Sequence, residues 1–314
     1  IRIPQYTSVT INSGASIISP VWDGYSGGIV SFRTTGTVNV TGSINTTSKG
    51  FRGGTGASDD VRGFQGESYT GTGTQAEANN NGAGGGGYTG GDDSYPGGGG
   101  GAGYSAAGVQ GAGLLEPESG DAGVQYGNAN LSIISLGSGG GEGGSTDGNS
   151  GSNGGYGGGI IIIYANEISG AGTILSIGGN GVDGTDGGNT GLGGAGGGGA
   201  SGGSILLSGN NLSLTQVNAT RGYGGAGVVN RVYNGGNGAD GRIRLDYNTL
   251  TGTTIPSSGY NGSANYSTRT LYNGSYSFNL TAPASAGIYP IKVNVTVGSN
   301  YAENTVNLNV TITA

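Results

Sequence analysis

The chain has 314 residues, of which 78 are glycine, only 11 are Lys or Arg, and none is Cys or His. Its formal net charge of −7 argues against nucleic acid as a partner, because phosphate binding needs clustered basic side chains. The missing Cys and His argue against disulfides and zinc sites. No apolar run approaches the ~18–20 residues of a transmembrane helix, so we expect no transmembrane segment.

One unit recurs along the first part of the chain: a glycine pair, a short aliphatic strand, a polar break and a second alternating strand. Copies follow Gly27, Gly158 and Gly202, and a truncated copy follows Gly241. Alternation of apolar and polar residues with a period of two predicts strands. Repeats with a small apolar face bury that face by stacking on their neighbours. We therefore expect residues 1–252 to form a stacked, solenoid-like β core.

Glycine tracts interrupt these repeats, and the longest runs are Gly84–Gly87, Gly97–Gly101 and Gly196–Gly199. Polyglycine can form an extended helix with three residues per turn, which rises ~3.1 Å per residue. Such helices can pack laterally through backbone N–H to C=O bonds and Cα–H contacts. We expect long polyglycine II-like excursions from the core. Their lateral bonds must be dense, because glycine loses more entropy on ordering than other residues.

Residues 253–314 hold only 5 glycines and predict a second domain of short strands. The candidates are Tyr266–Leu271, Tyr276–Leu280, Ile288–Val297 and Thr305–Thr313. An immunoglobulin-like sandwich needs about seven strands over ~100 residues, so the tail is expected to be a small, incomplete sandwich with an open edge. The expected fold class is all-β, with domains at 1–252 and 253–314.

Eleven Asn-x-Ser/Thr sequons predict N-glycosylation of an exposed surface, and six of them lie in the last 54 residues. The alternative is that triplets such as Asn-Val-Thr are simply good strand formers on an exposed face. The sequons are Asn39, Asn45, Asn130, Asn211, Asn218, Asn261, Asn265, Asn273, Asn279, Asn294 and Asn309.

Two short motifs suggest chemistry. Gly178–Asp183 and Gly235–Asp240 match the first six positions of a calcium-binding repeat, G-G-x-G-x-D. Asp183 and Asp240 are therefore candidate calcium ligands, although ordinary glycine and Asx turns account for the same pattern. Ser201 lies in a G-x-S-x-G motif, but the chain holds no histidine to accept its proton. We expect no enzymatic activity and no cofactor other than calcium.

The N-terminus carries an apolar set of four residues, Ile1, Ile3, Val9 and Ile11. Pro4 suits an edge or strand-entry position, because it cannot donate a ladder hydrogen bond. Since the tail is short of strands, we expect this segment to add a strand to a neighbouring copy. Such a joint is heterologous and propagates into an open filament. Pairing of the same strand within its own chain is the alternative.

The unit Ile160–Tyr164 followed by Ser176–Gly181 resembles glycine-rich extracellular repeat proteins of archaea and bacteria. The tail around Pro283–Tyr289 and Val293–Val297 resembles the immunoglobulin-like modules of prokaryotic surface layers. The glycine tracts are also similar to the tip adhesins of T-even phage tail fibres, which pack polyglycine helices into a sandwich. These resemblances imply an extracellular or cell-surface location.

Two functions fit this location. The first is a structural subunit of an extracellular filament or surface sheath, a homopolymer held by β-strand contacts between subunits and N-glycosylated. The second is an adhesin that binds a receptor or glycan through its glycine-rich loops.

Overall fold

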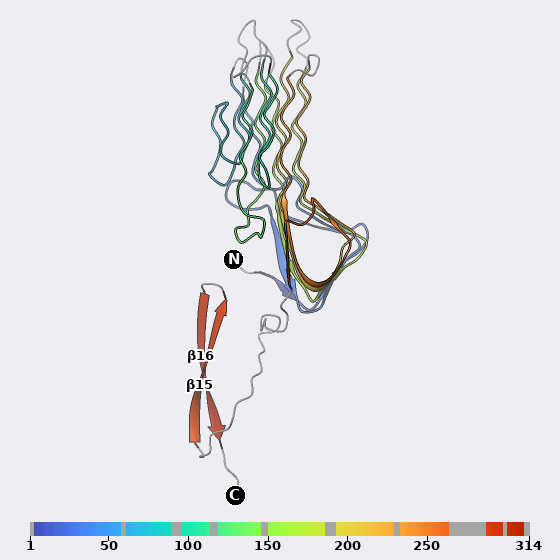
Figure 1. Cartoon of the computed structure of the whole chain (residues 1–314), viewed down its shortest axis with the longest axis vertical. Coiled ribbons are helices and arrows are strands. Elements are labelled where there is room, and N and C mark those ends of the chain that lie inside the picture. The colour runs from blue at the N-terminus through green and yellow to red at the C-terminus, as the bar shows by residue number, and fades with distance from the viewer. Residues whose placement is uncertain are drawn as a thin grey trace. The chain divides into compact units, whose positions relative to one another are not determined.

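A computed structural model describes residues 3–57, 61–88, 96–113, 119–145, 150–185, 193–228, 233–263, 287–297 and 300–310 (Figure 1). Contacts within the chain divide it into two units, Ile1–Arg269 and Thr270–Ala314. The boundary therefore follows residue 269, whereas the change in glycine content placed it after residue 252. Each unit is considered by itself.

Strands are the only regular elements of the first unit's described residues, and all of them pair in parallel. Most are short because the chain turns a corner every few residues. Their bounds are β1 (Gln5–Tyr6), β2 (Val9–Ile11), β3 (Ser16–Ile18), β4 (Ile29–Thr34), β5 (Thr37–Val40), β6 (Ser43–Asn45), β7 (Ile160–Tyr164), β8 (Glu167–Ser169), β9 (Thr173–Leu175), β10 (Ser204–Ser213), β11 (Gln216–Asn218), β12 (Arg242–Thr251), β13 (Thr254–Ile255) and β14 (Tyr260–Ser263).

The chain runs round the core in repeated circuits, and successive circuits pair in register. A nine-stranded sheet contains the path β1-β4-β7-β10-β8-β5-β2, with β12 paired to β10 and β14 paired to β12. A five-stranded sheet has the order β13-β11-β9-β6-β3. The register stacks like residues in columns; one column runs Val30, Ile161, Ile205 and Ile243.

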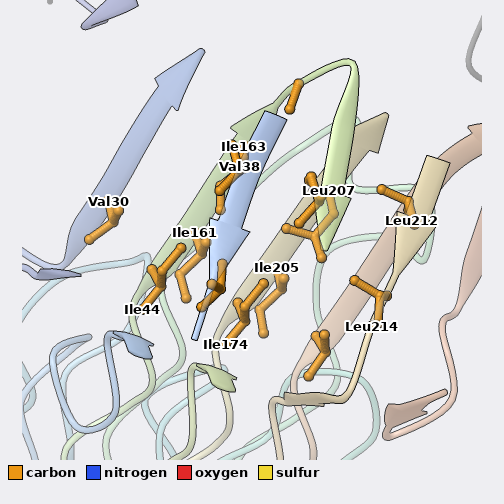
Figure 2. Packing of buried hydrophobic residues seen from close by; sticks show 14 of the residues in the cluster. Val30, Val38, Ile44, Ile161, Ile163, Ile174, Ile205, Leu207, Leu212 and Leu214 are labelled. Atoms are coloured by element: carbon orange, nitrogen blue, oxygen red, sulfur yellow. The ribbon is translucent and has the colours of Figure 1, made fainter. Parts of the chain in front are cut away.

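These columns form the apolar core. Val30 is 6% exposed, and Ile161, Ile205 and Ile243 are fully buried. Figure 2 shows Ile44, Ile161, Ile174, Leu207 and Leu212 among the side chains that project from several strands into one apolar cluster. Burying one such aliphatic side chain contributes ~1.5–3 kcal/mol to folding. The Val- and Ile-rich strands therefore form because both their neighbours and their inner face are apolar.

The predicted fold class, a solenoid-like core with glycine-rich excursions joined to an immunoglobulin-like sandwich, is wrong. The main sheet is parallel and barrel-like, because its strands wrap round a common interior (Figure 1). The described part of the second unit is one antiparallel pair, β15 (Gly287–Val297) and β16 (Asn300–Val310). Period-two alternation identifies strands, but it fixes neither their direction nor the number of sheets. The predicted strands Tyr266–Leu271 and Tyr276–Leu280 lie outside the described residues.

Between circuits the chain leaves the core as extended glycine-rich segments that lie side by side (Figure 1). We call them together the glycine array. Its segments are residues 50–57, 61–67, 72–78, 82–88, 96–104, 107–113, 119–126, 137–145, 150–159, 176–185, 193–203, 219–228 and 233–241.

Backbone hydrogen bonds in the array repeat every third residue, which is the period of the polyproline II type of helix. In segment 96–104, each set of N–H groups three residues apart reaches a different neighbouring segment. Gly97, Gly100 and Gly103 donate to Tyr88, Gly85 and Gly82; Gly98 and Gly101 donate to Ala112 and Val109; Gly99 and Ala102 donate to Gly196 and Gly199.

Segment 137–145 lies at the centre of the array and exchanges backbone hydrogen bonds with six other described segments. Its partners are 50–57, 61–67, 82–88, 96–104, 150–159 and 193–203. At the glycines of this segment, the neighbouring backbones leave no room for a Cβ atom. A Cβ on Gly141 would overlap the carbonyl oxygen of Gly85, and one on Gly198 would overlap that of Gly100. Glycine is therefore required here by the approach of neighbouring backbones.

Alanine at Gly198 should lower the free energy of unfolding of the first unit by roughly 2–4 kcal/mol, because the methyl group forces segments 193–203 and 96–104 apart. Gly194→Ala is the matched control in the same segment. There the nearest atom to the added carbon, the Ser150 oxygen, is 3.2 Å away, and the expected change is about 1 kcal/mol or less. Urea unfolding of both variants measures the difference; equal effects would contradict the close packing.

Candidate assembly and modification surfaces

The parallel sheets of the core end in strands that pair on one side only. Among the described residues, β1 pairs only with β4 and β14 pairs only with β12, and these strands lie at opposite ends of the run β14-β12-β10-β7-β4-β1. In the five-stranded sheet, β3 and β13 are the two edges. Edge strands present a row of unpaired backbone groups that can template pairing with another chain.

Apolar side chains are exposed at both ends of the stack. At the β1 and β3 end, Ile3 is 43%, Tyr6 50% and Ile18 64% exposed. At the other end, Ile255 is 56% and Tyr260 42% exposed. Natural proteins usually protect open edges with charged side chains. The exposed apolar residues at these edges therefore favour strands that pair with another chain.

The structure separates the four residues predicted to form the polymer contact. Val9 and Ile11 pair within the chain, opposite Val38 and Val40, and Ile11 is only 4% exposed. Ile1 lies outside the described residues. Of the four, Ile3 alone is described and exposed, two residues before the edge strand β1 begins.

The two calcium candidates have protein partners. Asp240 forms an ion pair with Arg221, at 2.9 Å from Nε to Oδ1, and also accepts the Arg221 backbone N–H. Asp183 accepts the N–H of Ala226 at 2.7 Å. Within the described ranges, no group of three or more Asp, Glu, His or Cys residues could hold a metal ion.

These acidic residues belong to two rows of Asn and Asp side chains spaced three residues apart. We call them the amide rails: Asn180 and Asp183 on one side, and Asn234, Asn237 and Asp240 on the other. Both rails flank the outer segment 219–228 and accept its N–H groups. The bonds are Tyr223 to Asn180, Ala226 to Asp183, Gly227 to Asn234, Gly224 to Asn237 and Arg221 to Asp240. The three-residue spacing therefore follows the period of the array. This spacing of Asn and Asp residues is the sequence signal by which the rails could have been found.

Glu142 is a feature that the sequence did not reveal. It lies in the central segment 137–145 and is only 1% exposed. Its carboxylate accepts the backbone N–H groups of Gly56, Ala57 and Phe64 at 3.0–3.1 Å. Burial raises the pKa of this carboxyl, and the three N–H donors offset part of that rise. The side chain thus supplies acceptors where no carbonyl of a neighbouring segment does.

The raised pKa of Glu142 has a definite sign for stability. The folded state binds this proton more tightly than the unfolded state, whose Glu pKa is ~4.3. The Glu142 contribution to stability is therefore fully present below that value and is lost as pH rises through the folded-state pKa. Between about pH 4 and about pH 7, the wild type should lose more unfolding free energy than Glu142→Gln. Parallel pH profiles from urea unfolding would contradict this assignment.

Buried tyrosines join the array to the core. Tyr104 and Tyr126 stack with ring centroids 4.6 Å apart, and the Arg242 guanidinium lies 5.1 Å from the Tyr104 ring. Arg242 also donates to the carbonyl oxygens of both tyrosines. Burial raises the pKa of both phenols, so they remain neutral hydrogen-bonding groups. Tyr104 shares a hydrogen bond of 2.6 Å with Ser204 at the start of β10.

The remaining chemical candidates are occupied by structural bonds. Ser201 is fully buried, and its Oγ accepts the N–H of Ser138. An open groove of about 210 Å³ runs beside segments 50–57, 61–67 and 72–78. Its charged residues, Arg52 and Glu67, pair at 2.9 Å, and Trp22 donates its indole N–H to Glu67. This groove therefore offers a neutral, hydrogen-bonded surface.

Six sequons fall where side chains are described. Asn130, Asn211 and Asn261 are exposed, whereas Asn39, Asn45 and Asn218 are half-buried. In Asn45, Asn130 and Asn218 the Oδ1 atom accepts the N–H of the Ser or Thr two residues on, which forms an Asx turn. The side chains of Asn265, Asn273, Asn279, Asn294 and Asn309 lie outside the described residues.

Asn130 and Asn261 should carry glycans in protein purified from its natural producer, because both side chains are exposed. Asn39 lies half-buried inside β5 and serves as the matched comparison, with lower expected occupancy. Glycopeptide mass spectrometry measures all three sites. Unmodified peptides at both Asn130 and Asn261 would contradict the prediction.

No protein family, curated protein or solved structure matches the chain. Over the part of the chain that the structure describes, no helix is long and apolar enough to cross a membrane.

Proposed function

We propose that the protein is a structural subunit of an extracellular filament or surface sheath, which polymerises through β-strand contacts between copies. The observation that carries this proposal is the pair of open strand edges, β1 and β14, at opposite ends of one parallel run. A joint between two different surfaces of the same subunit is head-to-tail, and such joints propagate into open filaments.

Three further features support an extracellular structural role. The chain holds eleven sequons, and three of the six asparagines whose side chains are described are exposed. Its low charged content and dense backbone bonding suit a rigid unit more than a moving one. Each candidate for catalysis or metal binding that the sequence suggested is tied up in structural hydrogen bonds.

An adhesin is the second candidate, and one observation favours it. Described residues that border the chain reversals of the array lie together at its end away from the core (Figure 1). Val61 exchanges backbone hydrogen bonds with the Ser145 hydroxyl, and Gly194 donates to the Thr185 oxygen. A rigid platform whose described segments end side by side suits the display of binding loops.

Negative-stain microscopy of the purified full-length chain separates these two functions. A filament subunit should form fibres with a regular axial repeat as the protein concentration rises. The fibres should persist in 1 M salt at roughly unchanged concentration, because strand pairing and apolar contacts are screened little by ions. Isolated particles at every concentration tested would contradict the filament and leave the adhesin as the better proposal.

A further inference from the structure

We infer that the joint between copies is parallel strand addition, with β14 of one copy pairing with β1 of the next. This inference rests on the proposed filament and names the strands, their register and the residues in contact. The partner surface is a second copy of this chain. The joint differs from strand donation into the tail, because both strands belong to the first unit.

The register of the sheet supplies the first argument. In the nine-stranded sheet, Cα pairing carries one column from Gln5 at one edge to Gly262 at the other. Every step is parallel and in register, through Arg33, Tyr164, Ser208 and Asp246. Placing Gln5 of a second copy next to Gly262 therefore repeats a spacing of ~4.8 Å that the sheet already uses.

Backbone groups on β1 are available for this pairing. Arg33 donates its N–H to the Pro4 oxygen, and Thr35 donates to the Tyr6 oxygen. Alternate residues of a strand bond to opposite neighbours. The N–H and C=O of Gln5, between these two residues, consequently point away from β4 and toward an incoming strand.

Side chains match across the joint. Ile3 and Tyr260 stand two residues before Gln5 and Gly262, and they are 43% and 42% exposed. Joining the copies brings these two apolar side chains together on the outer face of the sheet. Gly262 has no side chain to obstruct Gln5. The Arg244 guanidinium lies 4.9 Å from the Tyr260 ring on the other side, so it would repel a positive charge introduced at position 3.

The geometry also excludes a competing joint. Ile18 and Ile255 share one column of the five-stranded sheet and are both exposed. Direct contact between them would place β3 on β13. That arrangement would put the β1 of the incoming copy in the position that β14 already occupies, because Gln5 and Gly262 share a column. The two joints are mutually exclusive.

A charge exchange tests the joint. Ile3→Lys and Tyr260→Glu are made singly and together in the full-length chain, and the critical concentration for fibres is measured by sedimentation and negative stain. Each single variant should raise the critical concentration at least about tenfold, because it replaces the apolar contact between Ile3 and Tyr260 with a charge against an apolar side chain. The double variant should return to within about threefold of the wild type, because the new charges meet across a head-to-tail joint.

Two controls make the outcome decisive. Val182→Lys changes an exposed apolar residue, 52% accessible, in segment 176–185 of the glycine array and should leave the critical concentration unchanged. Ile18→Lys with Ile255→Glu tests the competing joint; rescue by this pair and not by the first would overturn the inference. Fibres that are indifferent to Ile3→Lys and Tyr260→Glu would also overturn it, while the filament function would stand. A wild type that forms no fibres refutes both.

Discussion

The lateral hydrogen bond between neighbouring glycine backbones is the interaction on which the rest of this structure depends. It recurs every third residue, so each segment of the glycine array can bond to several neighbours at once. One such bond contributes only ~0.5–1.5 kcal/mol net, and ordering glycine costs more entropy than ordering any other residue. The array is therefore stable only when nearly every N–H finds a carbonyl, which requires neighbours on all sides and the absence of Cβ atoms.

The β core determines where the glycine array begins. Segments that lead into β7 and β10 already bond to one another and to the ends of earlier strands: Gly158 donates to Ser201, Gly203 to Ser176, and Gly159 to Thr46. Because the strands pair in register, the segments that continue from them enter the array at the spacing of neighbouring strands. The large excursion between β6 and β7 then adds segments around this first row. The apolar columns and the glycine array are consequently one continuous hydrogen-bonded structure, joined by Tyr104, Tyr126 and Arg242.

Local pattern predicted some of this architecture and left the rest open. Ile160–Tyr164 was recognisable as a strand because its β-branched residues follow a glycine pair. Its partners, β4 and β10, lie far away in sequence, and alternation carries no information about which strands pair or in which direction. Asp183 and Asp240 fit both a calcium motif and ordinary Asx turns, because a motif of six residues cannot show that segment 219–228 passes between them. Glu142 gave no signal, since its acceptor role depends on residues of two other segments.

The sides of the glycine array and the edges of the core leave different groups open to another chain. Along the outer segments of the array, side chains supply the hydrogen-bond acceptors. The amide rails accept the N–H groups of segment 219–228, and the Gln65 amide oxygen accepts the Thr74 N–H. These side chains take the place of a further glycine segment, so lateral addition of another chain gains few backbone bonds. At the core edges β1 and β14, Ile3 and Tyr260 stand exposed instead of charged groups. In the proposed filament, this difference favours contact through the core edges over contact through the sides of the array.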